Sequence, residues 1–329
     1  MELRVLNASE VRAALPMAVA IEAMKDAYRQ LSLGLADAPL RSRIDIPDQD
    51  AAALFMPAFL SQTGDLAVKV VSIFPRNAER GLPTLHALVV VLDAATGRPA
   101  ALLEGSSLTA LRTGAGSGAA TDLLARPEAR VGAVFGSGGQ ARTQLEAICT
   151  VRPLERVWIV GRDRAKAEAF AREMAGQGPI PRDVRVADEP SQAVSQADVV
   201  CTATTSSTPV FDGNDLRPGA HVNAIGGFTP RMQEVDAVTV QRARVFVDSR
   251  AAALAEAGDL IEPIRQGVIP SDWIVGELGE VVAGAVPGRR SQEEITLFKS
   301  VGVSVQDAVA AARALERARA ADLGTVLRL

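Results

Sequence analysis

Basic side chains stand in apolar or glycine-containing segments of the first third of the chain, where they could hold a negatively charged small molecule. Lys69 lies within the apolar run Leu66–Val71, and Arg112 lies in the segment Thr109–Ala115. A lysine inside an apolar strand is costly to bury without a partner, because desolvation disfavours its charged form. Two plainer interpretations stay open: an edge-strand lysine whose ammonium reaches water, and an arginine that forms a structural ion pair.

Arg41 and Arg43 add two more cations at the start of an expected strand over 43–46. Because they are two residues apart, both side chains would point to the same face of a strand. The spacing therefore does not choose which of them would contact a ligand, and a solvated strand end also explains both.

A glycine-rich turn follows the apolar run Val131–Phe135 and precedes a helical stretch. Gly136 permits a tight turn, Gly138 lets the backbone approach a pyrophosphate, and Ala141 keeps helix and strand close together. The N-terminus of the helix faces the phosphate charge. This context predicts a dinucleotide site, with an ordinary glycine-rich turn as the alternative. The segment has the G-x-G-x-x-A form of the dinucleotide fingerprint and reads Gly136-Ser137-Gly138-Gly139-Gln140-Ala141.

The end of the next expected strand indicates which dinucleotide binds. Where an NAD-binding strand usually ends in Asp or Glu, this sequence reads Gly161-Arg162 after the run Val157–Val160. A small residue followed by arginine suits the 2′-phosphate of NADP(H) better than a free ribose hydroxyl. Asp163 could bind the ribose, and it is also well placed as the N-cap of the next helix. We therefore expect NADP(H), with NAD(H) as the alternative.

The elements that position this turn alternate between short buried strands and helices from about Val131 onward. Such alternation predicts βαβ units, that is, an α/β fold with a Rossmann-type doubly wound parallel sheet. The expected strands cover 131–135, 157–160, 184–187, 199–202, 220–225 and 245–248, and the expected helices cover 139–150, 163–175 and 191–197.

The chain before about residue 125 has a different pattern. One helical stretch is followed by short β-like runs with turn signals between them, which predicts an α+β domain with a mostly antiparallel sheet. The charges of a long Ala/Arg helix near the end of the chain are expected to face solvent. The expected strands cover 43–46, 52–60, 66–74, 85–92 and 100–103, and the expected helices cover 14–33, 107–124 and 305–323.

Composition excludes several classes of function. The 329 residues are 48% hydrophobic and 22% charged with a formal net charge of −4, which fits a globular protein and disfavours nucleic-acid binding through a basic surface. We expect no membrane span and no signal peptide. Cys149, Cys201, His86 and His221 lack metal-ligand spacing, so we expect no metal site. Buried thiols, a structural His221 and a reducing, cytoplasmic location are the corresponding expectations.

The sequence resembles the ornithine cyclodeaminase/mu-crystallin family over nearly its whole length. This family also includes certain alanine dehydrogenases and cyclic imine reductases. The motifs that carry the resemblance are Met56-Pro57-Ala58, Val68-Lys69-Val70, Arg80-Gly81-Leu82-Pro83-Thr84, Leu108-Thr109-Ala110-Leu111-Arg112-Thr113, the glycine-rich turn, His221-Val222-Asn223-Ala224-Ile225-Gly226, Gly276-Glu277-Leu278-Gly279-Glu280-Val281 and Phe298-Lys299-Ser300-Val301-Gly302.

The resemblance implies a homodimer of two-domain subunits. A second α+β domain, for substrate binding and dimerisation, would comprise 1–127 plus 305–329, and the dinucleotide-binding domain would comprise 128–304. Positions matching Arg41, Lys69 and Arg112 would hold the α-carboxylate of an amino or imino acid. An arginine can bind a carboxylate through two parallel hydrogen bonds, and Lys69 can exchange a proton if its pKa is lowered.

Further site residues follow from the same resemblance. His86 stands where many relatives carry glutamine, so we expect it to line the substrate pocket. The expected cofactor site comprises Thr113, Gly136, Ser137, Gly138, Gly139, Gln140, Ala141, Gly161, Arg162, Asp163, Thr202, Asn223 and Gly226.

One departure from the family pattern bears on the reaction. Cyclodeaminases of this family carry an acidic residue for proton transfer at the position of Phe228, although Glu234 and Asp236 are close enough in sequence to substitute. Since a phenyl ring cannot exchange protons, we expect a reductase that transfers hydride from NAD(P)H to the C=N bond of a small α-imino acid. Candidate substrates are Δ1-pyrroline-2-carboxylate, Δ1-piperideine-2-carboxylate and acyclic imines. The alternatives are alanine dehydrogenase or iminosuccinate reductase, ornithine cyclodeaminase, and a crystallin-like protein that binds NADPH without turnover.

Overall fold

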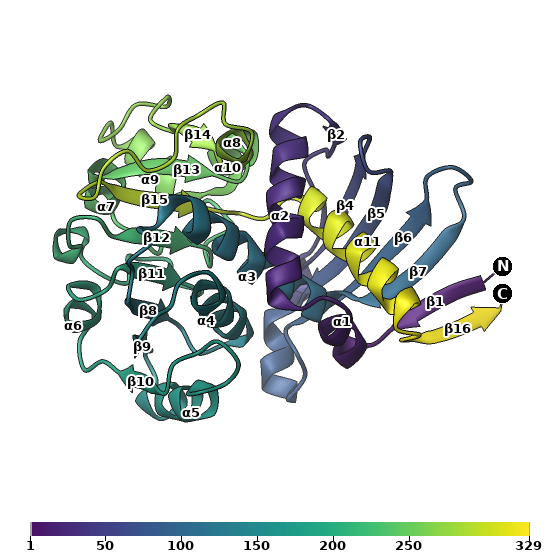
Figure 1. Cartoon of the computed structure of the whole chain (residues 1–329), viewed down its shortest axis with the longest axis horizontal. Helices are drawn as coiled ribbons and strands as arrows, with labels where there is room; N and C mark the ends of the chain where they lie inside the picture. The colour runs from purple at the N-terminus through teal and green to yellow at the C-terminus, as the bar shows by residue number, and fades with distance from the viewer. Residues whose placement is uncertain (1, 329) are drawn as a thin grey trace. The chain divides into compact units, whose positions relative to one another are not determined.

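The computed structural model describes residues 2–328 (Figure 1). Contacts divide the chain into two compact units: the first runs to Arg112 and resumes at Val303, and the second comprises Thr113–Gly302. The division falls within helix α3, Gly105–Leu124, whereas the sequence suggested a boundary after residue 127. A helix can continue through a boundary between two units, so the end of α3 at Leu124 does not mark the boundary.

The first unit contains an eight-stranded sheet in the order β16-β1-β7-β6-β5-β4-β2, with β3 paired to β4. All its pairs are antiparallel except β1 with β7. Its elements are β1 Glu2–Leu6, α1 Ala8–Ala14, α2 Met17–Ser32, β2 Ala36–Asp37, β3 Ser42–Ile46, β4 Ala51–Leu60, β5 Asp65–Ile73, β6 Leu85–Asp93, β7 Pro99–Glu104, α11 Ser304–Ala320 and β16 Thr325–Arg328, with short 3₁₀ turns at Pro47–Gln49 and Pro75–Arg80.

Successive residues of the central strands point to opposite faces of this sheet. One face carries Met56 of β4, Lys69 of β5 and Val89 of β6, which lie opposite one another in the cross-strand register. Helix α11 packs on β4, β5 and β6, and α2 packs on α11. Lys69 therefore lies in the core of the unit, beneath a helix that the chain supplies more than 200 residues later.

The second unit contains an eight-stranded sheet in the order β10-β9-β8-β11-β12-β15-β13-β14. Every pair in it is parallel, so the expected α/β fold with a Rossmann-type doubly wound parallel sheet is confirmed. Its elements are β8 Val131–Phe135, α4 Gly139–Val151, β9 Arg156–Val160, α5 Arg164–Met174, β10 Asp183–Val186, α6 Pro190–Val194, β11 Val199–Thr202, a 3₁₀ turn Gly213–Asp215, β12 His221–Ala224, α7 Ala237–Arg242, β13 Ala243–Val247, α8 Arg250–Glu256, α9 Gly258–Arg265, β14 Gly276–Glu277, α10 Leu278–Val282 and β15 Ile295–Lys299.

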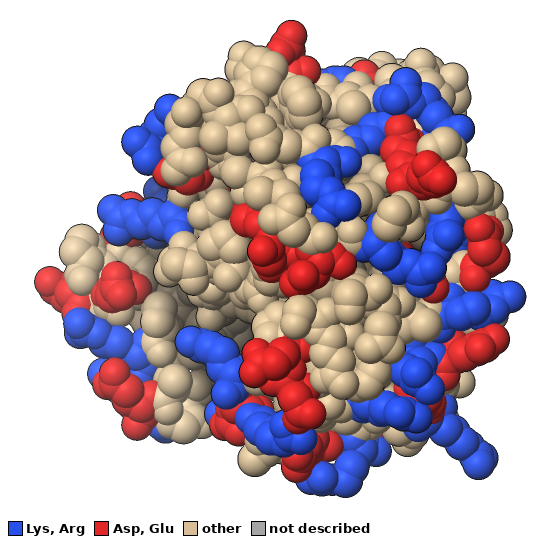
Figure 2. Space-filling view, turned by 90° about the vertical axis from the view of Figure 1, so that its left-hand side faces the viewer, with Lys and Arg blue, Asp and Glu red and all other residues tan. Residues whose placement is uncertain are grey.

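The charged surface is mixed. Glu316, Arg317 and Arg319 of α11 are exposed, as expected, although residues 304–311 of the same helix are buried. On the face shown in Figure 2, Lys and Arg side chains are interspersed with Asp and Glu instead of forming one basic patch. Among residues 2–328, none of the helices combines the length and apolar character that crossing a membrane requires.

Candidate active site

Three charged side chains meet in the core of the first unit. Lys69 Nζ lies 2.7 Å from Asp307 Oδ2, and Arg112 Nε donates a hydrogen bond of 3.0 Å to Asp307 Oδ1. The Lys69 and Asp307 side chains are 2% and 1% exposed. Asp307 lies in the first turn of α11, where the helix dipole favours a negative charge. The sheet thus supplies the lysine, and α11 supplies the carboxylate between the two cations.

A chain of hydrogen bonds orients Arg112. Its Nη1 donates to Gln306 Oε1 at 2.7 Å, and the Gln306 side-chain amide donates to the hydroxyl of Tyr28 at 2.7 Å. Gln306 Oε1 also accepts from the Val303 backbone N–H at 3.0 Å. All three side chains are buried. The guanidinium is therefore held on two sides before any ligand binds.

The cluster holds more positive than negative charge. Burial, the charge of Arg112 and, to a smaller extent, the charge of Arg41 together lower the pKa of Lys69 to about 7, although Asp307 opposes the shift. Two cations and one anion leave an excess of one positive charge when Lys69 is protonated, and desolvation makes such an excess costly. An anionic ligand would compensate it.

The surroundings of the two candidate arginines differ. Arg41 directly precedes β3, and its charge contributes to the lowered pKa of Lys69. Arg43 instead forms an ion pair of 2.7 Å with Asp45, and both side chains are at least half exposed. Arg41 is therefore the arginine whose charge acts on Lys69.

His86 is not brought together with these residues. It pairs with Ser72 across β5 and β6, whereas Lys69 pairs with Val89. Since alternate residues point to opposite faces, the exposed His86 side chain lies on the face of the sheet away from Lys69. Its expected place beside the basic residues does not agree with this arrangement.

The glycine-rich turn of the second unit fits a pyrophosphate. Gly136 has φ of +108°, and a Cβ there would lie 2.6 Å from the Ala203 carbonyl oxygen, so a side chain is excluded. At Gly138, the N-cap of α4, a Cβ would meet no atom of the described chain within 4 Å, and no side chain caps the helix. The backbone N–H groups of Gly139, Gln140 and Ala141 begin this helix and are available to an anion. Ser137 lies in the turn, and Ala141 packs in the core.

The end of β9 presents an exposed arginine. Arg162 follows Gly161 and is exposed, and within residues 2–328 we find no carboxylate paired with it. Asp163 accepts a hydrogen bond from the Lys166 backbone N–H at 3.1 Å and caps α5, which lowers the pKa of its carboxyl group. Asp163 was expected either to bind the ribose or to cap the helix, and the structure shows the helix cap.

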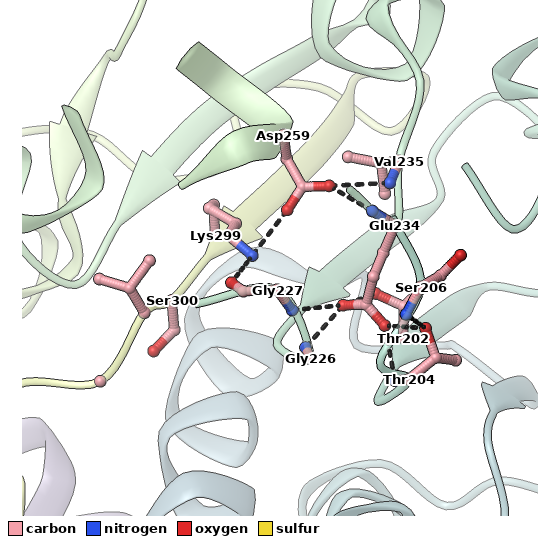
Figure 3. A network of polar contacts seen from close by, with 12 residues as sticks. Thr202, Thr204, Ser206, Gly226, Gly227, Glu234, Val235, Asp259, Lys299 and Ser300 are labelled. Atoms are coloured by element: carbon pink, nitrogen blue, oxygen red, sulfur yellow. Dashed lines mark hydrogen bonds and ion pairs between the residues drawn. The ribbon is translucent and has the colours of Figure 1, made fainter. Parts of the chain in front are cut away.

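Other expected cofactor residues have their side chains engaged within the second unit. The Thr202 hydroxyl donates to Glu234 Oε2 at 2.9 Å, and the Gly226 N–H donates to the same oxygen at 2.6 Å (Figure 3). The Asn223 amide donates to the Thr121 hydroxyl at 2.9 Å and contacts the ring of His221. Thr113 lies half-buried on α3.

The two carboxylates considered as substitutes for an acidic residue at Phe228, Glu234 and Asp236, are engaged in other contacts. Phe228 is half-buried. The nearby Glu234 carboxylate accepts five hydrogen bonds and is fully buried. Asp236 caps α7 by accepting from the Thr239 N–H and also accepts from the Gly213 N–H. Within this segment both carboxylates thus have structural partners.

The remaining histidine and the cysteines are core residues. Burial lowers the pKa of His221 to about 3 and keeps its ring neutral. Burial raises the pKa of both the Cys149 and Cys201 thiols to about 12. Residues 2–328 contain no group of three His, Cys, Asp or Glu side chains that could hold a metal ion.

Asp307, Gln306 and Tyr28 are site residues that the sequence did not reveal. Asp307 resembles an ordinary acidic residue at the start of a helix, and nothing local indicates that a strand lysine lies against it. The available signal was indirect, because a buried Lys69 requires a carboxylate partner.

The whole chain can be compared with known proteins. The model of the ornithine cyclodeaminase/mu-crystallin family matches residues 1–322. A Δ1-pyrroline-2-carboxylate reductase of Bacillus cereus is 40% identical over 315 residues, covering 95% of this chain and 96% of that protein. The structure of Thermococcus litoralis Δ1-pyrroline-2-carboxylate reductase in complex with NADH and L-proline has a TM-score of 0.94 at 39% identity, covering 98% of this chain and 99% of that one. An archaeal alanine dehydrogenase dimer with bound NAD has a TM-score of 0.92 at 32% identity, covering 100% of both chains. The protein therefore belongs to the ornithine cyclodeaminase/mu-crystallin family.

Proposed function

We propose that this protein is an NAD(P)H-dependent oxidoreductase that reduces the C=N bond of a small α-imino acid. The observation that carries the proposal is the buried cluster of Lys69, Arg112 and Asp307, whose excess positive charge suits one carboxylate. The glycine-rich turn of the same chain supplies a dinucleotide site. Relatives named Δ1-pyrroline-2-carboxylate reductase make that cyclic imine the first substrate to test.

Arg112, Lys69 and Arg41 would bind and orient the α-carboxylate. Arg112 is fixed by Asp307 and Gln306, so a carboxylate meets a guanidinium whose orientation is already set. Such preorganisation lowers the entropic cost of placing the imine carbon for reaction. Arg41, just before β3, contributes positive charge near Lys69.

Lys69 would donate the proton that the imine nitrogen requires. When bound, the reduced nicotinamide supplies a hydride to the imine carbon, and the nitrogen needs one proton to become an amine. With its pKa near 7, the Lys69 ammonium can donate that proton at neutral pH, and Asp307 holds the ammonium in place. In the reverse direction the neutral amine of Lys69 would accept the proton, as an amino-acid dehydrogenase requires.

We propose NADPH as the preferred cofactor, on the support of Arg162. Its exposed guanidinium follows Gly161 at the end of β9, and the neighbouring Arg164 is already paired with Asp188 and Glu168. The similar pyrroline-2-carboxylate reductase and alanine dehydrogenase structures are complexes with NADH and NAD, so NADH is the alternative.

We also propose that the first unit forms a homodimer through the open face of its sheet. Three successive cross-strand rows on the face away from Lys69 are apolar, beside the polar pair of Ser72 and His86; they are Phe55–Val70–Leu88, Pro57–Val68–Val90 and Phe59–Leu66–Leu92. Of these residues, Phe59, Val70 and Leu88 are 37%, 37% and 48% exposed. A contiguous apolar face of this kind marks an interaction surface. For the compartment we propose the cytoplasm, because its reducing conditions would keep the two buried cysteines as thiols.

A substrate panel tests the proposed activity. Purified protein with NADPH or NADH would be mixed with cyclic imines of five and six ring atoms, with pyruvate or oxaloacetate plus ammonia, and separately with L-ornithine plus NAD⁺. Loss of reduced nicotinamide absorbance with an α-imino acid supports the proposal. Cofactor binding without turnover on the whole panel would indicate the non-catalytic alternative, and ammonia release from ornithine would indicate a cyclodeaminase.

A further inference from the structure

The strand order assigns the two halves of a bound dinucleotide to different loops. In an open parallel sheet, a ligand lies outside the carboxyl ends of the strands, at the point where the order reverses. Here β8 is the first strand, with β9 on one side and β11 followed by β12 on the other. A dinucleotide with its pyrophosphate at the turn after β8 and its 2′-substituent at Arg162 after β9 would have its nicotinamide half on the side of β11 and β12.

The loops after β11 and β12 share one buried carboxylate. Glu234 Oε1 accepts from the N–H and the hydroxyl of Thr204, at 2.6 and 2.8 Å. Glu234 Oε2 accepts from the Thr202 hydroxyl at 2.9 Å and from the N–H groups of Gly226 and Gly227 at 2.6 and 3.1 Å (Figure 3). Each oxygen thus binds the loop after β11, and Oε2 also binds the loop after β12.

The ion pair of Asp259 and Lys299 fixes the backbone around Glu234. Asp259 Oδ1 accepts from the N–H groups of Glu234 and Val235 at 2.6 and 2.9 Å. Lys299 lies 2.7 Å from Asp259 Oδ2 and donates to the Gly227 carbonyl oxygen at 2.6 Å. Glu234, Asp259 and Lys299 are all fully buried. Asp259 therefore holds the backbone at Glu234, and its partner Lys299 holds the backbone at Gly227. Together these contacts fix the position of the Glu234 carboxylate.

The two loops also touch directly. A Cβ on Gly226 would lie 2.1 Å from the Thr204 carbonyl oxygen and 2.6 Å from Glu234 Oε1. Two contacts thus set the spacing of the loops. The backbone of Gly226 lies against the backbone of Thr204, and both loops donate hydrogen bonds to the Glu234 carboxylate. A change at either contact must move one loop relative to the other.

We propose that Glu234 is a positioning residue for the nicotinamide half of the cofactor. It would act by holding the loops after β11 and β12 at one spacing through the five hydrogen bonds that its oxygens accept. The inference rests on the proposed dinucleotide-dependent function but concerns binding of the cofactor, so it can be tested without turnover.

The test compares Glu234→Gln with Asp236→Asn. The glutamine keeps one carbonyl oxygen, but its NH₂ group cannot accept a hydrogen bond. It therefore loses either the acceptor for Thr204 N–H or the acceptor for the Gly226 and Gly227 N–H groups. Asp236 is the matched control, because it lies two residues away and its partners are Gly213 and Thr239. Binding of NADPH and of 2′-phospho-ADP-ribose, which lacks the nicotinamide, would be measured by calorimetry together with the melting temperature.

For Glu234→Gln we expect the Kd of NADPH to rise about tenfold or more and the Kd of 2′-phospho-ADP-ribose to change less than about twofold. KM for the imino acid should rise less than KM for NADPH. Equal weakening of both ligands, or an unchanged Kd for NADPH, would overturn the proposal, as would the same selective loss in Asp236→Asn. If Glu234→Gln does not fold, Thr204→Val removes one of the five hydrogen bonds to Glu234, together with the acceptor of the Ser206 N–H. It should weaken NADPH selectively by a smaller factor; no selective change would overturn the proposal.

Discussion

Replacing Asp307 with asparagine removes the one negative charge between Lys69 and Arg112 while keeping the size of the side chain. The two cations then face each other without an anion, so the ammonium form of Lys69 becomes harder to maintain. We expect the pH above which imine reduction declines to move to lower values, because reduction requires protonated Lys69.

The size of this shift follows from the loss of the ion pair between Lys69 and Asp307, which lowers the pKa of Lys69. The ion pair of Lys69 and Asp307 is 2.7 Å long and almost fully buried, so salt screens it little. Removing one partner of a buried pair costs about 3–5 kcal/mol, which corresponds to at least two pKa units at about 1.36 kcal/mol each. Starting from a pKa of about 7 for Lys69, a fall of two units lowers the protonated fraction at neutral pH from about one half to about 1%.

The assay is a profile of kcat/KM for imine reduction against pH, for the parent protein and for Asp307→Asn. We expect the decline to begin at least two pH units lower and kcat/KM at neutral pH to fall by about 50-fold. Asp45→Asn is the control, since it removes a carboxylate from an exposed ion pair with Arg43 and should leave the profile unchanged. An Asp307→Asn profile that superimposes on that of the parent would refute the proposed role of the cluster.

Further predictions concern the other sites. Arg112→Lys should keep the charge but lose the two-bond geometry, lowering kcat/KM at least tenfold with little change in the Kd of NADPH; unchanged steady-state kinetics would contradict this. Arg162→Ala should lose a charge-assisted contact worth roughly 1.5–3 kcal/mol and hence about tenfold or more of any preference for NADPH over NADH, as fluorescence titration of both cofactors would show. Val70→Glu should give monomers in sedimentation velocity, whereas Leu254→Glu on the other unit should not. If Phe228 stands at the position of the cyclodeaminase carboxylate, as the resemblance implies, L-ornithine with NAD⁺ should give no proline and no ammonia above background.

Local patterns predicted much of the second unit. The runs expected at 131–135 and 199–202 are β8 and β11 without any shift, because apolar runs between turn and helix signals mark buried parallel strands. The strand β15, Ile295–Lys299, was not predicted, although it lies inside the sheet. Its short apolar run ends in Lys299, and only the contacts of this lysine with Asp259 and Gly227 explain how its charge is buried.

The sequence predicted Lys69 and Arg112 of the candidate substrate site but not their partner Asp307. The types and contexts of Lys69 and Arg112 indicated buried cations, since charge in an apolar segment needs a partner. Their partner Asp307 is separated from Lys69 by most of the chain, and no local rule selects one carboxylate among many at such a distance. His86 was misplaced for a related reason: a resemblance at one position does not tell which face of a strand a side chain occupies, whereas the pairing of β5 with β6 does.

Transfer of deuterium is the most direct test of the central claim that hydride goes to an imine carbon. The protein would be incubated with Δ1-pyrroline-2-carboxylate and NADPH deuterated on either face of nicotinamide C4, and the product would be examined by NMR. We predict proline with one deuterium at its α-carbon from one of the two labelled cofactors and none from the other. Proline without deuterium from both cofactors, or no oxidation of NADPH or NADH by this or any other α-imino acid, would contradict the claim.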